Sequence, residues 1–294
     1  MSVAQSPISR VTSRPAAVTM VAMWPTWLNA LSTASWIVSL RRSSRPIMGA
    51  ILPQCPGWDQ LGAAGYNRAL MELAPRLIEV STPAAAAGAV LVLHGGASRR
   101  RSMRVSPTQL SVLRMIPIAA RIARAGGGRL AVFRLLNTTR GWDTSHTPVQ
   151  DAHWGLGQMA ARMGQLPTCL VGHSLGGRAA LLATDRPEVR GTVALAPWVY
   201  PYDGVSGIGG KRILFVHGSD DRVASPDRAA VVARRLAREA EVSFVDVRGG
   251  KHAMLGRREL FDGLAAEFST SLLLGQSHDA NIARLQNGER WIEV

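Results

Sequence analysis

Short apolar runs alternate with helix-like stretches along most of the chain, and this alternation limits the possible folds more than any other feature. Helical periodicity is plain in Val149, Ala152, Leu156, Met159 and Met163, which recur at intervals of three and four. Runs of strand length lie at 89–93, 130–133, 168–171, 192–195, 213–216 and 242–247. Strands joined by helices form a parallel sheet covered on both faces. We therefore predict an α/β fold with a mostly parallel sheet.

Composition divides the 294 residues into three parts. Residues 1–58 contain five arginines and no acidic residue, whereas the alternating pattern occupies residues 59–275. Residues 276–294 are mostly polar. We expect a basic N-terminal extension, one α/β domain and a polar C-terminal tail. The N-terminal half of the sheet is expected to be abbreviated, because 77–80 is the one clear strand before the run at 89–93.

The uncharged segment 15–40 has several interpretations. It lies between Arg14 and Arg41, as a membrane anchor or an export signal would, but Pro25, Asn29 and many Ser and Thr residues reduce its apolarity. It is equally consistent with disordered sequence, or with translation that starts at Met48. We expect a cytoplasmic protein, with membrane anchoring or export through residues 15–40 as the alternative.

The charge of the chain is strongly positive but does not point to nucleic acid. The net charge is +14, and 32 of the 34 basic residues are arginine. These arginines are scattered along the expected helices, and no nucleic-acid-binding motif accompanies them. The two cysteines, Cys55 and Cys169, do not make a disulfide framework, and no Cys-x-x-Cys or His cluster suggests a metal. We expect no nucleic-acid partner, no metal and no cofactor.

One strand runs into a turn that presents a serine. The run 168–171 leads into Gly172-His173-Ser174-Leu175-Gly176, and a helix is expected from Leu175 to Thr184. The spacing Gly-x-Ser-x-Gly is that of a nucleophile elbow, which requires small residues where the backbone turns sharply. In a chain this rich in Gly and Ser the pattern alone is weak, so the strand before it and the helix after it carry the argument.

A serine nucleophile needs a base and an acid, and both follow later strands. His252 lies in a glycine-rich turn after the strand 242–247, and Asp221 follows the strand 213–216. The carboxyl ends of parallel strands share one edge of the sheet, so Ser174, Asp221 and His252 can meet there. Asp220 and Asp246 are alternatives for the acid, but the spacing from the preceding glycine favours Asp221.

These motifs together resemble one superfamily. They are His94-Gly95-Gly96, Gly172-His173-Ser174-Leu175-Gly176-Gly177, Ala196-Pro197-Trp198, His217-Gly218-Ser219-Asp220-Asp221 and Gly250-Lys251-His252. Over residues 90–273 the chain resembles the α/β-hydrolase superfamily, whose triads follow the chain order Ser, Asp, His. Within it, the motifs are similar to those of small bacterial dienelactone-hydrolase-like and prolyl-oligopeptidase-like esterases.

The resemblance implies a role for each site residue. Ser174 would be the nucleophile, His252 the base and Asp221 the acid that orients it, while the backbone N–H groups of Gly96 and Leu175 would bind the oxyanion. The implied activity is hydrolysis of a carboxylic ester, or of a thioester, lactone or small amide, in a small-molecule acyl substrate. An acyltransferase with the same triad, or a non-catalytic binding protein with this fold, is the alternative.

The surroundings of the expected site indicate an open crevice. Trp142 and Trp198 lie in loops near it and are candidates to line an acyl pocket. Many α/β hydrolases insert a lid after the strand that ends here at Leu195, but only residues 197–211 precede the next strand. We therefore expect no lid domain and a modest acyl substrate. The remaining histidines at strand ends are expected to be structural: His94, His173 and His217.

Overall fold

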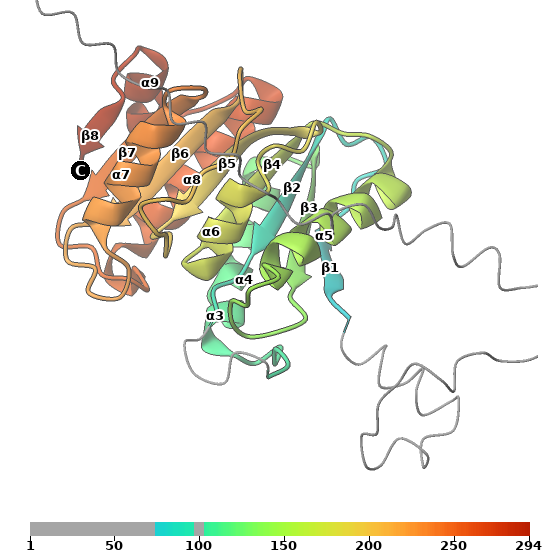
Figure 1. Cartoon of the computed structure of the whole chain (residues 1–294). Helices are drawn as coiled ribbons and strands as arrows, with labels where there is room; N and C mark the ends of the chain where they lie inside the picture. Colours follow the sequence, from blue (N-terminus) through green and yellow to red (C-terminus); the bar gives the residue numbers. More distant parts are fainter. Residues whose placement is uncertain (1–73, 97–102) are drawn as a thin grey trace, which may run out of the picture. The chain divides into compact units, whose positions relative to one another are not determined.

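The computed structural model describes residues 74–96 and 103–294. Their eight strands form one sheet in the order β1-β3-β2-β4-β5-β6-β7-β8 (Figure 1). β1 (Arg76–Ser81) runs antiparallel to β3 (Leu130–Leu136), and every other neighbouring pair is parallel. The predicted α/β fold with a mostly parallel sheet is confirmed.

The central strands are buried on both faces. Every residue of β2 (Gly88–Leu93) and β4 (Thr168–His173) is buried, as expected for parallel strands between two helical layers. Side chains of β2 alternate between two hydrophobic clusters, with Val90 and Val92 on one face and Leu91 and Leu93 on the other. The remaining strands are β5 (Val189–Leu195), β6 (Arg212–Gly218), β7 (Glu241–Val247) and β8 (Trp291–Glu293).

Three helices cover the face of the sheet that is turned to the viewer in Figure 1. They are α5 (Thr147–Met163), α6 (Leu175–Leu182) and α7 (Pro226–Leu236). The predicted stripe of α5 is confirmed, because Val149, Ala152, Leu156 and Met159 are all buried. α7 begins as its sequence indicates: the Ser225 side chain accepts a hydrogen bond from the Arg228 N–H, and proline occupies the first turn.

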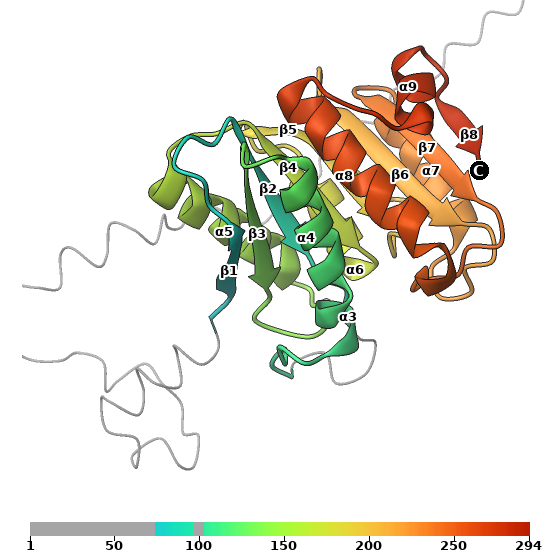
Figure 2. The same ribbon diagram turned by 180° about the vertical axis from the view of Figure 1, so that it is seen from behind.

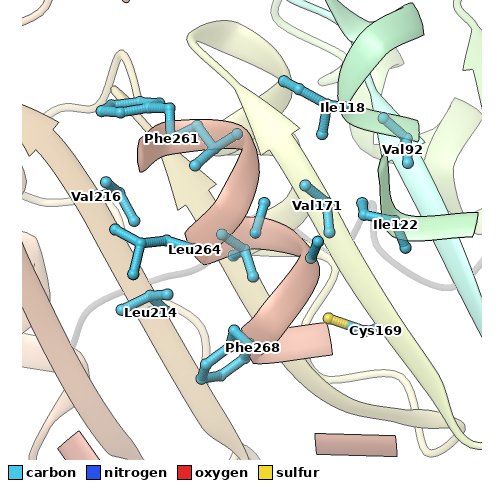
Figure 3. Packing of buried hydrophobic residues seen from close by; sticks show 14 of the residues in the cluster. Val92, Ile118, Ile122, Cys169, Val171, Leu214, Val216, Phe261, Leu264 and Phe268 are labelled. Atoms are coloured by element: carbon cyan, nitrogen blue, oxygen red, sulfur yellow. The ribbon is translucent and has the colours of Figure 1, made fainter. Parts of the chain in front are cut away.

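The opposite face, which Figure 2 turns to the viewer, is covered mainly by α4 (Met115–Ala125) and α8 (Arg258–Leu274). Phe261, Leu264 and Phe268 of α8 pack with Ile118 and Ile122 of α4 on the strands (Figure 3). α8 ends before Gly275, whose φ of 67° is a left-handed conformation that terminates the helix. The short α3 (Leu110–Leu113) precedes α4, the 3₁₀ turn η4 (Leu255–Arg257) precedes α8, and α9 (Ala280–Gln286) follows it.

The loop between β5 and β6 contains no lid domain. Residues 196–211 connect the two strands directly, without a further helix or strand. The abbreviated N-terminal half of the sheet is also seen, because within the described residues only β1 precedes β2. The carboxyl edge of the sheet at β4 to β7 is therefore bounded by loops of the domain itself.

The C-terminal residues differ from the polar tail expected at 276–294. They form α9 and β8, and β8 pairs with β7 at the edge of the sheet. Ile282, Leu285 and Ile292 are buried in the same cluster as α8. α9 has seven residues and β8 has three, and both are too short to show a periodicity. Their buried apolar residues therefore gave no signal in the sequence.

Some expectations fall on residues that the structure does not describe. The extension 1–58, with the uncharged segment 15–40, lies wholly outside the described residues. In residues 74–96 and 103–294, no helix combines the length and the apolarity that crossing a bilayer requires.

The docking of β8 can be tested at Ile292. This side chain is 4% exposed and packs on the cluster under α8, so Ile292→Ala removes buried methyl groups and leaves a cavity. We expect the free energy of unfolding in urea to fall by about 2 kcal/mol or more. Ile116→Ala, at a side chain that is 42% exposed, is the matched control and should change it by less than about 0.5 kcal/mol. Equal losses in the two variants would contradict the docking of β8.

Candidate active site

Ser174 lies at the turn between β4 and α6 and has a strained backbone, with φ of 56°. The flanking glycines make this turn possible, since a Cβ atom on Gly172 would lie 2.1 Å from the carbonyl oxygen of Gly176. A Cβ atom on Gly176 would lie 2.5 Å from the carbonyl oxygen of Leu93 on the neighbouring strand. The Ser174 N–H donates to the Leu195 carbonyl at 3.0 Å. These contacts hold a half-buried serine at the carboxyl edge of the sheet.

The structure brings Ser174, His252 and Asp221 together, although 78 residues separate the first two in the sequence. Nε2 of His252 lies 3.0 Å from Oγ of Ser174, and Nδ1 lies 2.7 Å from Oδ2 of Asp221. A carboxylate oxygen accepts, so Nδ1 carries a proton. In the neutral ring Nε2 then has a free lone pair, which can accept the Ser174 hydroxyl proton.

The loops that carry His252 and Asp221 pack backbone against backbone. A Cβ atom on Gly218 would lie 2.2 Å from the Gly250 carbonyl oxygen. The end of β6 can therefore approach the turn that carries His252 this closely only because position 218 is glycine. The Asp220 N–H donates to the same carbonyl at 3.0 Å. This contact fixes the separation of the two loops, which in turn fixes Asp221 relative to His252.

Asp221 is surrounded by hydrogen-bond donors. Its Oδ1 accepts from the N–H groups of Val223 and Ala224 at 2.8 and 2.9 Å. Burial on its own raises the pKa of Asp221, but hydrogen bonds from His217, His252 and Ala224 outweigh burial and hold the pKa well below its usual range. The carboxylate is therefore ionised at neutral pH. Of the alternatives for the acid, Asp220 is exposed on the turn and Asp246 lies within β7, and His252 contacts neither.

His173 is buried and supports His252 through the backbone of His252. Its Nε2–H donates to the carbonyl oxygen of His252 at 2.9 Å, and the two rings lie 5.0 Å apart. Burial, together with the neighbouring His252, lowers the pKa of His173 to about 3. A neutral His173 can therefore hold His252 in place without adding a charge beside it.

His94 joins the loop after β2 to the loop after β3. The Asn137 N–H donates to its Nε2 at 3.1 Å, so its proton is on Nδ1 and is donated to the Gly95 carbonyl at 2.6 Å. Burial lowers the pKa of His94 to about 4. This histidine therefore fixes the Gly95-Gly96 segment beside the serine.

The expected oxyanion donors, Gly96 and Leu175, are in contact. A Cβ atom on Gly96 would lie 2.4 Å from Cδ1 of Leu175 and 2.4 Å from the Arg140 carbonyl oxygen. A Cβ atom on the preceding Gly95 would lie 3.2 Å from Cβ of Ser174. Leu175 is the first residue of α6, so its N–H has no acceptor within the helix. Both backbone segments thus pass directly beside the serine.

A buried ion pair that the sequence analysis missed lies behind the serine. Arg178 of α6 donates to both carboxylate oxygens of Asp203, at 2.7 and 2.8 Å. Its guanidinium lies 4.0 Å from the centre of the Trp142 ring and 4.8 Å from that of Tyr200. A charged residue in the otherwise apolar sequence of α6 was the available signal. Trp142, expected to line the substrate pocket, thus also packs on this pair.

Trp198, the other expected lining residue, is joined to the elbow directly. Its N–H donates to the Ser174 carbonyl at 3.0 Å, and its ring is partly exposed beside Tyr200. A cavity of about 300 Å³ adjoins it. The residues that line this cavity are Trp198, Val199, Asp221, Arg222, Val223, Ser225, Pro226 and Arg228. The cavity thus adjoins Asp221 and Trp198, but neither Ser174 nor His252 lines it.

Arg114 is a second residue that sequence reasoning did not identify. Its Nε donates to the carbonyl oxygen of Ala253, next to His252, at 3.0 Å. Its Nη2 lies 2.7 Å from Oδ1 of Asp262 in α8. The loop that carries His252 is therefore attached to helices on one face of the sheet. Among the described residues, no group of three or more His, Cys, Asp or Glu side chains is arranged to hold a metal ion.

The fold and part of the sequence match known hydrolases. A family model described as "Alpha/beta hydrolase family" matches residues 156–263. A comparison with curated protein sequences gives no match.

Solved structures with similar folds have low sequence identity to the chain. Est1E from Butyrivibrio proteoclasticus, with bound ferulic acid, has a TM-score of 0.51 at 13% identity, over 68% of this chain and 96% of that one. An α/β serine hydrolase without a lid from Xanthomonas campestris has a TM-score of 0.51 at 15% identity, over 67% and 87%. EstE1, a thermophilic carboxylesterase cloned from a metagenomic library, has a TM-score of 0.52 at 19% identity, over 71% and 94%. At these identities the likeness shows the fold.

The chain has the α/β-hydrolase fold, and the resemblance to the α/β-hydrolase superfamily that its motifs indicated is confirmed. The similar structures include a lidless serine hydrolase, in agreement with the direct connection between β5 and β6.

The buried pair of Arg178 and Asp203 can be tested by neutralising the acid. Their side chains are 4% and 8% exposed, so Asp203→Asn leaves an uncompensated cation next to the elbow. We expect the free energy of unfolding to fall by about 3–5 kcal/mol. Glu79→Gln breaks the exposed pair with Arg162 and should change it by less than about 1 kcal/mol. Similar small losses in both variants would show that Asp203 does not stabilise Arg178.

The buried histidines predict a pH dependence of stability. The pKa of His94 is about 4 in the folded chain against a usual value of 6.5, so below about 6.5 the unfolded chain binds a proton that the folded chain does not. Stability should therefore fall as the pH is lowered from about 6.5 to 4, by up to about 1.4 kcal/mol per pH unit for this group. We would measure the free energy of unfolding in urea at several pH values across this range. Plotted against pH, it should change less steeply for His94→Gln than for the unchanged protein. Equal slopes would contradict the lowered pKa.

Proposed function

We propose that this protein is a cofactor-independent serine hydrolase that cleaves a carboxylic ester in a small-molecule acyl substrate. The observation that carries the proposal is the hydrogen-bonded series from Asp221 through His252 to Ser174, with distances of 2.7 and 3.0 Å. The series lies at the carboxyl edge of the sheet, on an α/β-hydrolase fold. This combination supports nucleophilic acyl transfer.

In the first half of the reaction Ser174 is acylated. Its Oγ forms a bond to the acyl carbon while Nε2 of His252 takes the hydroxyl proton. The N–H groups of Gly96 and Leu175 stabilise the negative charge on the carbonyl oxygen. The tetrahedral intermediate collapses, and the leaving alcohol departs with the proton from His252. In the second half, water gives a proton to His252 and attacks the acyl carbon, and the new tetrahedral intermediate collapses to the free acid while His252 returns the proton to Oγ of Ser174.

Asp221 acts through the base without exchanging the proton itself. Its carboxylate remains ionised because of its lowered pKa, and it holds the His252 proton on Nδ1. It also stabilises the imidazolium that forms when His252 takes the serine proton. Loss of the carboxylate charge would therefore allow the wrong tautomer as well as weaken the base.

The open surroundings support a modest acyl group. Residues 196–211 connect β5 to β6 without a lid. Trp142 and Trp198 are the residues proposed to line the acyl site. Esters of short acids fit such a site better than long-chain lipids do, and a thioester, lactone or small amide would use the same machinery.

The same triad could transfer the acyl group to an alcohol other than water. The half-exposed serine favours hydrolysis, because water reaches the acyl-enzyme freely. A non-catalytic binding protein with this fold would not need the tautomer of His252 to be fixed by an ionised acid.

The proposal is tested with short 4-nitrophenyl esters and a fluorophosphonate probe. We expect stoichiometric labelling of the full chain and turnover that Ser174→Ala abolishes and that Asp221→Asn reduces by on the order of a thousandfold or more. Ser206→Ala changes an exposed serine in the loop between β5 and β6 and should leave labelling and turnover unchanged.

Two results would contradict the proposal. Labelling and turnover that persist in Ser174→Ala would exclude Ser174 as the nucleophile. Absence of both labelling and turnover in the folded, unchanged protein, across esters, thioesters and lactones, would favour the binding protein.

A further inference from the structure

His217 is a buried histidine that makes polar contacts as well as packing contacts. It lies near the end of β6 and is 0% exposed. Its Nε2 lies 3.2 Å from Oδ2 of Asp221 and 3.2 Å from the Ala224 carbonyl oxygen. A carbonyl oxygen only accepts, so Nε2 carries a proton. Nε2 of His217 therefore donates to the Ala224 carbonyl oxygen and at the same time lies within hydrogen-bond distance of Oδ2 of Asp221, a contact that helps to lower the pKa of that carboxyl.

The oxygen that His217 contacts is the one that faces the base. Oδ2 of Asp221 accepts from Nδ1 of His252 at 2.7 Å and from Nε2 of His217 at 3.2 Å. The other oxygen, Oδ1, accepts from the N–H groups of Val223 and Ala224. Four donors thus surround the carboxylate, and two of them share Oδ2.

These donors belong to different parts of the fold. Val223 and Ala224 directly follow Asp221, so their N–H groups fix the carboxylate relative to its own turn. His252 is on a separate loop and is the group to be oriented. His217 belongs to β6, a strand paired on both sides, and it is the donor that fixes Oδ2 relative to the sheet.

We propose that His217 is a positioning residue that, by donating from Nε2 to Oδ2 of Asp221, keeps this oxygen directed at Nδ1 of His252. The inference rests on the proposed function, because it assigns the support of the triad acid. His217 acts through Asp221 and does not touch the substrate.

The titratable groups that face His217 are Asp221, His252 and Asp246. Asp221 faces it from its own turn, and His252 lies beyond Asp221. Asp246 on β7 is its neighbour in the strand register. Burial and the nearby Glu293 raise the pKa of Asp246. Nδ1 of His217 is buried without a hydrogen-bond partner among the described residues.

Substitution of His217 by glutamine or by asparagine distinguishes this positioning role from a packing role. The side-chain nitrogen of glutamine can occupy the place of Nε2, whereas that of asparagine reaches only the place of Nδ1. His217→Asn should lower kcat for a short 4-nitrophenyl ester by about tenfold with KM within about twofold, because the acid loses its alignment. His217→Gln should retain most of kcat.

The dependence of kcat/KM on pH is a second measurement, and loss of packing alone would not shift it. Without the His217 donor, the charge on Oδ2 acts on protonated His252 alone and stabilises it more strongly. The acid limb of kcat/KM should therefore move to higher pH in His217→Asn and coincide with that of the unchanged protein in His217→Gln. Titration with the fluorophosphonate probe normalises each rate to the folded, active fraction.

The outcomes are distinct. If His217→Gln and His217→Asn have equal kcat values and neither shifts the acid limb, the inference is overturned. This holds whether both variants lose activity or both keep it, and His217 would then have a packing role. Turnover that persists in Ser174→Ala would instead overturn the proposed function. Loss of turnover in Ser174→Ala, with His217→Gln active and His217→Asn impaired, supports both.

Discussion

The candidate site depends on close approaches of the backbone that only glycine allows. Gly172 meets Gly176 at the elbow, and Gly218 meets Gly250 between the loops that carry the acid and the base. A Cβ atom at Gly172 or Gly218 would lie 2.1 or 2.2 Å from a carbonyl oxygen, well inside contact distance. These two contacts set where Ser174 and His252 can be. The hydrogen bonds of the proposed triad are therefore a consequence of backbone packing and not its cause.

Much of the fold could be predicted because its signals are long and repeated. The buried strands follow from continuous apolar runs, and the stripe of α5 follows from helical periodicity. α9 and β8 could not be predicted, since a helix of seven residues and a strand of three carry too little pattern. Their burial is decided by tertiary contacts, those of α9 with α8 and those of β8 with β7, which no local pattern encodes.

The site was predictable where a motif encodes a turn and hidden where contacts are tertiary. Ser174, Asp221 and His252 each follow a strand, so the parallel sheet alone predicts that they meet, and in the structure they lie within hydrogen-bond distance of each other in series. Arg114 and Arg178 act through partners 148 and 25 residues away. No local pattern distinguishes them from the many other arginines. Only the unusual place of Arg178 in an apolar helix gave a hint.

The two contacts of Arg114 link the loop that carries His252 to α8. Arg114 holds Ala253, the residue after His252, and at the same time pairs with Asp262 of α8. Because α8 also packs on the central strands, loosening of α8 would affect the His252 loop and the hydrophobic core together. The position of His252 and the integrity of the core are thus coupled in this chain.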